Sequence, residues 1–425
     1  MLVYVINKHG KPLMPTKPSK ARKLLKNNKA VIVSYKPFTI QLLYGSAGYT
    51  QKIDLGVDLG AKHIGIAIVS EDNVLDKGEI ELRQDVSQNI TTKKQYRRSR
   101  RKRKTRYRKP RFLNRTSSKK KGWLPPSIQS RIDNTFFWIN RFTSLLPNPN
   151  LSIEVGKFDI QKMENPNIQG GEYQKGDTFG FYNTRYYVFE RDNYTCQVCG
   201  KKGKILQTHH IVYRSMGGTD RAVNLLTVCT DCHTPENHKE GHILYDWCMN
   251  KKKMPNYKGS TFMNVIRKKV YANYPNARIT YGSITTPKRK SLRLEKTHYN
   301  DAIAITGTNK IAKNTNDYFL IKQFRKKKRS LHEAIPRKGR THKNTTAKRN
   351  SKNTKSAKGF FLNDLVEFEN QKGYISGFTG KTACYLRDIQ GHYITKKGKN
   401  YKKINLSECK QICHNNNWQF KRMTA

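Results

Sequence analysis

Apolar positions in the first part of the chain form short runs that predict strands and a few helices. Three short strands are predicted first, over residues 2–6, 30–34 and 38–43. Residues 19–29 read as a helix between the first two of them. Residues 53–70 then contain two apolar strands around a glycine-rich turn, and residues 74–82 read as a third, antiparallel strand. The pattern predicts a small β-rich unit followed by the opening strands of an α/β sheet.

The middle of the chain combines a helix, a strand and a polar insert. Residues 127–146 carry apolar side chains at helical spacing and predict a core helix. Residues 151–158 read as a buried strand that bears one carboxylate, Glu154. A stretch rich in Gly, Asn, Pro and Gln over 164–180 reads as a linker into a compact insert over 181–250.

After the insert the chain returns to helix and strand patterns and then changes composition. Residues 261–271 predict a helix, residues 277–284 a strand, and residues 298–306 a short helix. Residues 322–358 hold 15 Lys or Arg and one acid, so this segment is expected to be disordered alone or held by nucleic acid. Short strands with glycine turns over 360–420 predict a small β-barrel.

The charge of the chain indicates the class of its partner. The 425 residues hold 84 Lys and Arg against 30 Asp and Glu, which gives a formal net charge of +54, and only 36% of them are hydrophobic. Such a charge repels itself unless a polyanion neutralises it. A small DNA reader makes about 6–10 phosphate contacts, whereas a duplex of about 20 base pairs carries about 40 phosphates. The composition therefore favours a large nucleic-acid partner.

The same composition argues against a membrane or secreted protein. No run of 18 apolar residues exists, and residues 1–10 do not read as a signal peptide. Four of the eight cysteines lie in two tight pairs, which in a large basic protein indicates a metal site rather than disulfides. We therefore expect a cytoplasmic protein with no membrane partner.

One segment concentrates the positive charge. Residues 93–121 contain 17 Lys or Arg and no acid, and residues 95–109 are predicted to form one helix. An ordinary exposed helix would mix acids with bases to gain i,i+4 pairs. Arginine matches phosphate oxygens with a planar fork that lysine lacks. The predicted nucleic-acid-binding residues are Arg97, Arg98, Arg100, Arg101, Arg103, Arg106, Arg108, Arg111 and Arg115.

The strongest chemical signal lies in the insert. Two C-x-x-C pairs, Cys196 with Cys199 and Cys229 with Cys232, are separated by 29 residues. Four thiolates at this paired spacing suit a closed tetrahedral Zn²⁺ site with a structural role. The loop between the pairs is longer than in a plain zinc ribbon, so it is expected to hold further structure.

The histidines of the insert are left free for a second metal. His209 and His210 are adjacent, Asn224 follows, and His233 comes directly after Cys232. This arrangement resembles the HNH nuclease motif, a ββα-metal fold. The resemblance implies that His209 and His233 hold one Mg²⁺, that His210 is the general base on a water, and that Asn224 orients the site. Imidazole ligands also suit a softer metal, and a zinc knuckle with unrelated histidines is the alternative.

A second candidate site is scattered along the chain. Asp58 lies in the first core strand, Glu154 in a later one, and His298 and Asp301 near residue 300, with Asp54 on the same strand face as Asp58. The ordered segments GVDLG, IEVGK and HYNDA resemble the three motifs of the RuvC-type RNase H fold. The resemblance implies that Asp58 bridges two Mg²⁺ ions, that Glu154 and Asp301 complete the ligand set, and that His298 handles the proton of the attacking water. Three packed carboxylates would repel one another without such cations.

The order of the motifs resembles that of CRISPR effector nucleases with both RuvC-type and HNH domains, although the chain is too short for their recognition lobe. It resembles the compact, transposon-encoded IscB family, whose N-terminal PLMP domain matches Pro12-Leu13-Met14-Pro15. The implied fold class is α/β: an RNase H-like (RuvC-type) core split by an HNH domain, with a small N-terminal α+β domain and a C-terminal β-barrel. The implied domains are PLMP (1–50), RuvC-type segment I (51–92), an Arg-rich bridge helix (93–121), RuvC-type segment II (122–164), HNH with linkers (165–260), RuvC-type segment III (261–321), a basic linker (322–358) and the barrel (359–425).

The IscB resemblance implies an RNA-guided DNA endonuclease. Its guide would be an omega RNA, and its C-terminal domain would read a short target-adjacent motif in double-stranded DNA. The HNH site would cut the guide-paired strand and the RuvC-type site the displaced strand, with a monomeric protein inside a ribonucleoprotein. The residues agree, because no segment reads as a helix-turn-helix or a finger array that could select a long site.

Two alternatives to a guided nuclease stay open. One is a nuclease with the same domains that reads DNA through protein alone. The other is a non-enzymatic, zinc-containing RNA-binding protein. A further group of candidate ligands, Cys409, Cys413 and His414, is predicted to consist of packing residues.

Overall fold

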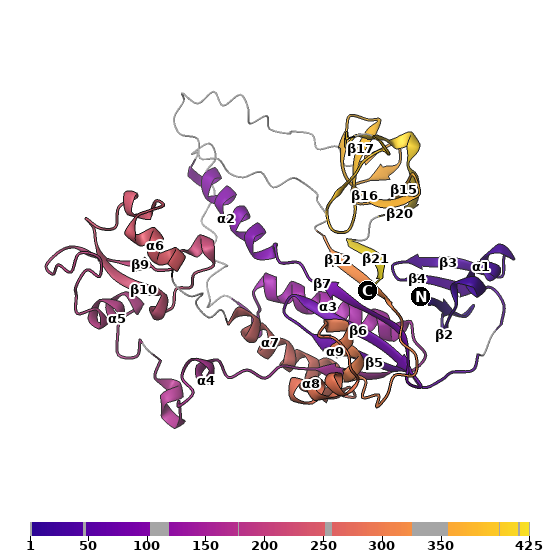
Figure 1. Ribbon diagram of the computed structural model, residues 1–425, viewed down its shortest axis with the longest axis horizontal. Coiled ribbons are helices and arrows are strands. Elements are labelled where there is room, and N and C mark those ends of the chain that lie inside the picture. Colours follow the sequence, from indigo (N-terminus) through magenta and orange to yellow (C-terminus); the bar gives the residue numbers. More distant parts are fainter. Residues whose placement is uncertain are drawn as a thin grey trace. The chain divides into compact units, whose positions relative to one another are not determined.

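The computed structural model describes residues 2–45, 48–102, 119–176, 178–250, 257–324, 356–398, 400–414 and 417–424, and only the backbone of residues 96 and 98–102. The chain forms two compact units (Figure 1). Unit 1 contains Met1–Gly156 and Ile266–Ala425, and unit 2 contains Lys157–Val265. Unit 2 is therefore an insertion in the chain of unit 1. None of the helices in the described ranges combines the length and apolar character that crossing a bilayer requires.

Unit 1 is built on a mixed seven-stranded sheet of order β11-β8-β5-β6-β7-β12-β21. Its strands are β5 (Asp54–Leu59), β6 (His63–Ser70), β7 (Asn73–Glu81), β8 (Asn150–Glu154), β11 (Arg278–Thr280), β12 (Asp317–Gln323) and β21 (Trp418–Thr424). β5, β6 and β7 pair antiparallel, β8 and β12 join them in parallel, and β21 pairs antiparallel with β12. β5 and β6 are almost wholly buried, which explains why their sequences read as nearly continuous apolar runs.

Helix α9 (His298–Ile305) lies against one face of this sheet at very short range. An ideal Cβ atom at Gly56 would lie 2.0 Å from the carbonyl oxygen of Ala302, and one at Gly65 would lie 1.9 Å from that of His298. Because no Cβ atom fits at these distances, the two glycines allow α9 to sit directly on the sheet. Side chains alternate along a strand, so Asp58 shares this face with Gly56.

Helix α3 (Pro126–Ser144) covers the opposite face of the sheet. Leu320 pairs with Glu79, which pairs with Gly65 on the α9 side, so the neighbouring Phe319 points the other way. Its ring stacks on Phe142 of α3 with 5.2 Å between ring centroids. The apolar stripe that predicted this helix is thus the surface that packs on the sheet.

Replacing Gly65 with alanine is expected to lower the free energy of unfolding of unit 1 by about 2–3 kcal/mol. The added methyl group cannot fit against the His298 carbonyl unless α9 moves away from the sheet. Urea denaturation followed by tryptophan fluorescence measures the loss. Gly377→Ala in β16 (Gln371–Thr379) is the control, because a Cβ atom there would lie 3.8 Å from Tyr385, an ordinary contact. Equal stabilities of the two variants would contradict the close-packing argument.

The N-terminal part of unit 1 is a four-stranded sheet of order β2-β1-β4-β3 with one helix. Its elements are β1 (Val3–Ile6), β2 (Pro12–Thr16), α1 (Pro18–Lys26), β3 (Ala30–Tyr35) and β4 (Phe38–Leu42). The Tyr4 hydroxyl donates a hydrogen bond to Asp76 of β7, and Arg422 of β21 forms an ion pair with the same carboxylate. Asp76 is only 3% exposed, so this buried triad joins the first strand, the main sheet and the last strand.

The C-terminal part of unit 1 holds a third sheet, the C-terminal sheet, which is antiparallel with the order β18-β17-β16-β15-β20 and has β19 paired to β17. Its further strands are β15 (Leu365–Phe368), β17 (Ala383–Arg387), β18 (Tyr393–Ile394), β19 (Ile404–Asn405) and β20 (Lys410–Cys413), and β13 (Ser356–Ala357) pairs with β14 (Phe360–Phe361) beside it. The strands enclose one core that includes Val366, Ile375 and Leu386. Within the described residues no ladder joins β20 to β18 or β19, so closure into a barrel stays a prediction.

Unit 2 has a ββα arrangement at its centre. Its elements are α4 (Ile160–Glu164), α5 (Thr184–Arg191), β9 (Leu206–His210), β10 (Leu225–Cys229), α6 (Ile243–Asn250), the short turns η2 (Gly170–Gln174), η3 (Arg214–Met216), η4 (Ala222–Asn224) and η5 (Glu236–His238), and the start of α7 (Lys258–Asn273). β9 and β10 form an antiparallel hairpin. Its core is small and includes Ile211, Val228 and Leu244 together with two cysteines.

Several element boundaries differ from the sequence-based expectation. The helix expected to begin at residue 95 is α2 (Val86–Lys102), which begins earlier because residues 86–94 contain no helix breaker, and its expected end at 109 lies outside the described residues. The strand expected over 151–158 ends at Glu154. The strand expected over 277–284 is only the three residues of β11, because α8 (Gly282–Ser291) already begins at Gly282.

The last strand of the chain also differs from expectation. The barrel is expected to include residues 359–425, but β21 pairs with β12 at the edge of the main sheet. β12 is not among the expected strands, and only its last two residues fall in the basic segment 322–358. Such long-range pairing depends on partners that local alternation does not reveal.

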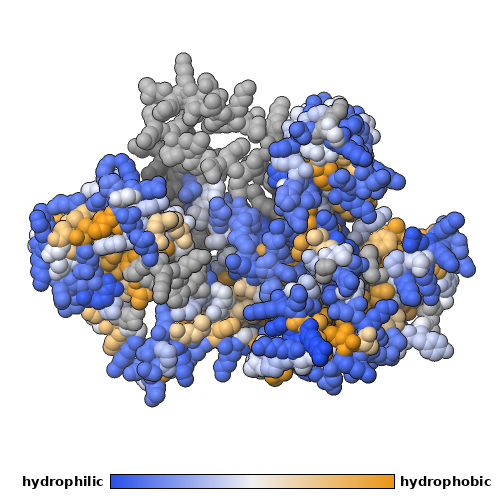
Figure 2. Space-filling model, viewed as in Figure 1, coloured by the Kyte–Doolittle hydropathy of each residue, from blue (hydrophilic) through white to orange (hydrophobic). Residues whose placement is uncertain are grey.

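On the face in Figure 2 hydrophilic side chains predominate, as the composition predicts.

Candidate functional site

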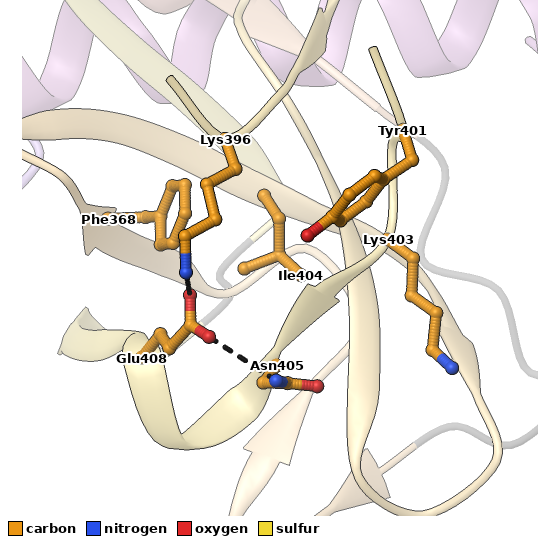
Figure 3. A pocket seen from close by; sticks show the side chains of 7 residues that line it. All are labelled: Phe368, Lys396, Tyr401, Lys403, Ile404, Asn405 and Glu408. Carbon is orange, nitrogen blue, oxygen red and sulfur yellow. Dashed lines mark hydrogen bonds and ion pairs between the residues drawn. The ribbon is translucent and has the colours of Figure 1, made fainter. Parts of the chain in front are cut away.

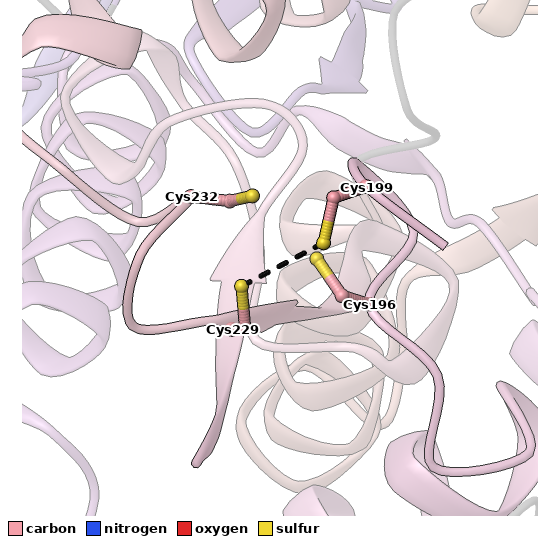
Figure 4. A group of neighbouring side chains, drawn as sticks. All are labelled: Cys196, Cys199, Cys229 and Cys232. Atoms are coloured by element: carbon pink, nitrogen blue, oxygen red, sulfur yellow. Dashed lines mark hydrogen bonds between the residues drawn. The ribbon is translucent and has the colours of Figure 1, made fainter. Parts of the chain in front are cut away.

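Four cysteine side chains converge in unit 2 beside the ββα hairpin (Figure 4). Cys196 and Cys199 lie in the loop after α5, Cys229 ends β10, and Cys232 follows it. Their sulfur atoms all lie within 4.8 Å of one another, and those of Cys199 and Cys229 are 3.9 Å apart. This donor set and its compactness fit a tetrahedral Zn²⁺ site.

Local electrostatics favour one thiolate in this group. Burial raises the pKa of Cys196, but backbone N–H groups of Cys199, Cys229 and Val198 stabilise its thiolate and bring the pKa down to about 6. Burial and the surrounding sulfur atoms raise the pKa of Cys232 instead. The thiolate is the form that binds a metal, and a cation would relieve the cost of ionising the remaining thiols.

A second cluster in unit 2 consists of three imidazoles, those of His209, His233 and His238. Their ring centroids lie 5.1–5.2 Å apart, and His209 Nδ1 is 3.2 Å from His233 Nε2. His233 Nδ1 donates to the side-chain oxygen of Gln207 at 2.6 Å, and His238 Nδ1 donates to the carbonyl oxygen of Thr234 at 2.6 Å. Because Nδ1 donates these hydrogen bonds, the Nε2 lone pairs of His233 and His238 are left to bind a metal inside the cluster.

The protein environment favours the neutral form of His209 and His233. Burial and the neighbouring imidazoles lower the pKa of His209 to about 4, and burial followed by His238 lowers the pKa of His233. His209 Nε2 is buried without a hydrogen-bond partner in the part of the chain that the structure describes. Neutral imidazole is the metal-binding form, so the cluster fits one cation. Three nitrogen donors favour an ion such as Zn²⁺ or Ni²⁺ over Mg²⁺, which prefers oxygen.

His238 is a site residue that the sequence reasoning did not find. The sequence pointed to His209 and His233 only, because His238 stands five residues after His233 and matches no helical or strand spacing. The short turn η5 brings its ring back to the cluster. A third histidine soon after a C-x-x-C-H segment is the signal that could have revealed it.

His238→Ala is expected to weaken Ni²⁺ binding to the three-histidine cluster by at least about 10-fold, because one of three imidazole donors is lost. Calorimetric titration of the protein with its thiol site already filled by Zn²⁺ measures the affinity. His242→Ala is the matched control, since His242 is exposed in the same segment and stands outside the cluster. Unchanged affinity in His238→Ala would remove His238 from the ligand set.

His210 follows His209 in β9 and contacts Asp220 instead of the imidazole cluster. Successive strand residues point to opposite faces, so His210 faces away from His209. Its Nε2 atom lies 2.8 Å from Asp220, and Arg214 contacts the same carboxylate at 2.8 Å. Nδ1 of His210 has no hydrogen-bond partner among the described residues, so this nitrogen can accept a proton from a water.

Asn224 fixes the loop between β9 and β10. Its side-chain oxygen accepts from the Val212 N–H at 3.0 Å, and its amide donates to the carbonyls of Val212 and Thr219 at 3.1 and 2.8 Å. Asn224 is fully buried. Because these bonds use both ends of the amide, Asn224 can orient the residues around the histidines but does not point into the imidazole cluster.

The four scattered residues of the second predicted site come together in unit 1. Asp58 of β5 and Glu154 of β8 are direct partners in the parallel ladder. His298 and Asp301 lie in the first turn of α9, which the glycines bring onto the sheet. His298 Nδ1 is 2.6 Å from Asp58 Oδ2, and Arg289 of α8 pairs with Asp301 at 2.7 Å. Local pairing and one close helix thus gather these side chains.

The acids of this group disfavour one another's ionisation. Burial raises the pKa of Glu154 to about 7, the negative charges of Asp58 and Asp301 add to this effect, and a hydrogen bond from Thr285 opposes it. Burial and Asp58 also raise the pKa of Asp301, and the hydrogen bond with Asp58 raises the pKa of His298. Carboxylates that repel one another fit Mg²⁺, a hard cation that takes oxygen ligands and would offset their negative charge.

The arginine-rich segment is only partly described. Arg97 lies in α2 with an exposed side chain, and Arg98, Arg100 and Arg101 belong to the same helix. The remaining predicted contacts, Arg103, Arg106, Arg108, Arg111 and Arg115, lie outside the described residues. An exposed guanidinium in a sequence segment that contains no acid suits a phosphate backbone.

The C-terminal candidate ligands do not form a cluster. Cys409 is buried in the core of the C-terminal sheet near Cys384. Cys413 lies beside Lys36, and His414 Nδ1 is 2.9 Å from Asp364. Only Cys409 is buried in a core as expected, since the side chain of His414 is 63% exposed.

A pocket of about 220 Å³ lies in the C-terminal part of unit 1 (Figure 3). It is lined by Phe368, Lys396, Tyr401, Lys403, Ile404, Asn405 and Glu408. Glu408 accepts from Lys396 at 3.1 Å and from Asn405 at 3.3 Å. Because these polar groups satisfy one another, the pocket's geometry assigns no ligand to it.

Two family models match the chain. The model described as RRXRR protein matches residues 3–176, in which residues 97–101 read Arg-Arg-Ser-Arg-Arg, and the model described as HNH endonuclease matches residues 196–239. No curated protein matches the chain. The crystal structure of the Type II-C Cas9 enzyme from Actinomyces naeslundii is similar over 61% of this chain and 60% of that chain, with 12% identity and a TM-score of 0.22. The chain therefore carries an RRXRR region followed by an HNH endonuclease domain, and that domain contains the four cysteines and all three clustered imidazoles.

Proposed function

We propose that the protein is an RNA-guided endonuclease of the IscB type, which cuts both strands of a DNA duplex at two metal-dependent sites. The observation that carries the proposal is the presence of two separate clusters in one chain. Unit 2 holds three clustered imidazoles, with His210 next to His209 in the chain, and unit 1 holds three carboxylates with His298. Each cluster has the donors that phosphodiester hydrolysis needs, a metal set and a proton acceptor.

In the HNH domain, His209, His233 and His238 would hold one cation, which supplies charge stabilisation at the scissile phosphate. Asp220 holds His210 at Nε2, so His210 accepts the proton of the attacking water at Nδ1. Asn224 keeps the intervening loop in place. The resemblance to IscB supports assigning the guide-paired strand to this site.

In unit 1, Asp58, Glu154 and Asp301 would hold two Mg²⁺ ions, which polarise the phosphate and lower the pKa of a bound water. Asp58 holds His298 at Nδ1, so His298 meets the proton of the water at Nε2. The pairing of Asp58 with Glu154 and the position of α9 support this RuvC-type reading. We assign the displaced strand to this site on the same resemblance.

The charge of the chain supports a structured RNA as its partner. A net charge of +54 and the arginines of the RRXRR region suit contacts with phosphate backbones. Such contacts position a nucleic acid but do not read its sequence. Base pairing with an omega RNA guide would select the target, the C-terminal part would read a short target-adjacent motif, and one protein molecule would form the ribonucleoprotein.

The experiment that tests the proposal begins with the RNA that copurifies with the protein. Sequencing is expected to find one abundant structured species with a variable end. Exchanging that end should move the cleavage site in a labelled DNA duplex, and His210→Ala should leave only the displaced strand cut. Cleavage at a defined sequence by ribonuclease-treated protein would instead establish a protein-read nuclease. Random copurifying RNA without any metal-dependent cleavage would establish a binding protein.

A further inference from the structure

Two side chains outside the predicted RuvC-type set lie near His298, and one of them, His63, contacts its ring directly. The ring of His63, at the start of β6, stacks on the His298 ring with 5.6 Å between centroids and an angle of 11° between planes. The carboxylate of Glu79, in β7, lies 2.5 Å from His63 Nδ1. Asp58 therefore contacts the edge of the His298 ring, and His63 contacts its face. Glu79 in turn contacts His63.

The strand register explains why these groups meet. Glu154 pairs with Asp58, Asp58 with Gly65, and Gly65 with Glu79, so one row crosses four neighbouring strands. Gly65 has no side chain, and the backbone of His298 occupies that gap. His63 stands two residues before Gly65 and so points to the same face. His298 thus lies between the acid pair on one side and the Glu79–His63 pair on the other.

His298 needs both contacts to keep one orientation. Its side chain is 41% exposed, so one hydrogen bond at Nδ1 would leave the ring free to swing about that bond. Stacking on His63 fixes the plane of the ring, since a flat neighbour restricts rotation that an edge contact permits. Together the contacts aim Nε2 in one direction. Misplacement of a reacting group by about 1 Å can cost about 100-fold in rate.

We propose that His63 and Glu79 are positioning residues of the RuvC-type site: Glu79 holds His63 flat against His298, and His63 fixes the plane in which His298 Nε2 meets the proton of the attacking water. This inference rests on the proposed function of the same site. The side chains of His63 and Glu79 are 37% and 21% exposed, so their contribution is to the site rather than to the core.

The experiment measures single-turnover cutting of each strand of a duplex labelled at both ends. His63→Ala is expected to slow cutting of the displaced strand by about 10- to 100-fold, with unchanged DNA affinity and unchanged cutting of the paired strand. His63→Phe keeps a flat ring and should restore the rate to within about threefold. Glu79→Gln, which keeps a polar side chain of the same length beside His63, should cut faster than Glu79→Ala.

A second measurement does not depend on cleavage. In histidine-labelled protein, stacking shifts the ring protons of His298 through the ring current of His63. His63→Ala should abolish this shift and His63→Phe should retain it, without a change in melting temperature. Equal rates and spectra for His63→Phe and His63→Ala would overturn the proposal.

The failure of this inference can be separated from the failure of the proposed function. If Asp58→Asn still cuts the displaced strand at the normal rate, the assignment of the RuvC-type site is wrong and this inference is lost with it. If Asp58→Asn abolishes that cut while His63→Ala leaves it at the normal rate, only the positioning role is overturned.

Discussion

Cys229→Ser is expected to unfold unit 2 and to abolish cutting by the HNH site. Two of the six buried residues of its core cluster, Cys196 and Cys229, are also candidate zinc ligands. A structural Zn²⁺ site contributes about 10–16 kcal/mol of apparent binding free energy in small domains. A core this small has little else to replace that contribution.

Elemental analysis for bound zinc and limited proteolysis measure this result. We expect the variant to lose the zinc of its four-cysteine site and to be cleaved within Lys157–Val265, while the proposed RuvC-type site of unit 1 continues to cut its strand. Cys248→Ala is the matched control, because Cys248 is a buried cysteine of the same unit that donates to the Met216 sulfur at 3.4 Å. Retention of zinc and of protease resistance in Cys229→Ser would contradict the structural role.

Asp58→Asn is expected to slow cutting by the proposed RuvC-type site by about 10²- to 10³-fold. The change preserves the shape of the side chain but removes the charge that lies closest to both Glu154 and His298. It should also lower the pKa of Glu154 from about 7, because the Asp58 charge is one cause of its rise. The effect therefore has a readout in the metal-free protein as well as in cleavage.

Single-turnover cutting of the displaced strand, with titration of Glu154 by carbon NMR, tests this expectation. Asp54→Asn is the matched control. Asp54 shares the strand and the face of Asp58, but it accepts a hydrogen bond from Asn150 at 3.0 Å and stands outside the cluster. A loss of the same size in Asp54→Asn would mean that the centre of the site has been placed four residues too far along β5.

Sequence reasoning located those site residues that stand close to one another in the sequence. The C-x-x-C pairs and the adjacent His209 and His210 can be read within one segment. Asp58, Glu154 and Asp301 are far apart, and only the order of their motifs suggested a common site. The structure brings them together through the β5–β8 register and α9, while their catalytic roles remain predictions.

Other features could not be read because they depend on partners distant in sequence. His238 reaches its cluster through a turn, and His63 reaches His298 through the register of three strands. The pairing of β12 with β21 joins one segment that precedes the C-terminal sheet in the sequence to another that follows it. A strand pattern gives the tendency to pair but does not name the partner.

The buried triad of Tyr4, Asp76 and Arg422 has a consequence for the order of events during synthesis. Tyr4 and Asp76 leave the ribosome long before Arg422 does. A carboxylate that is buried without its guanidinium is strongly unfavourable, so the nascent segments cannot settle around Asp76 while β21 is still unmade. The packing of unit 1 around Asp76 is therefore completed only after Arg422 has been made.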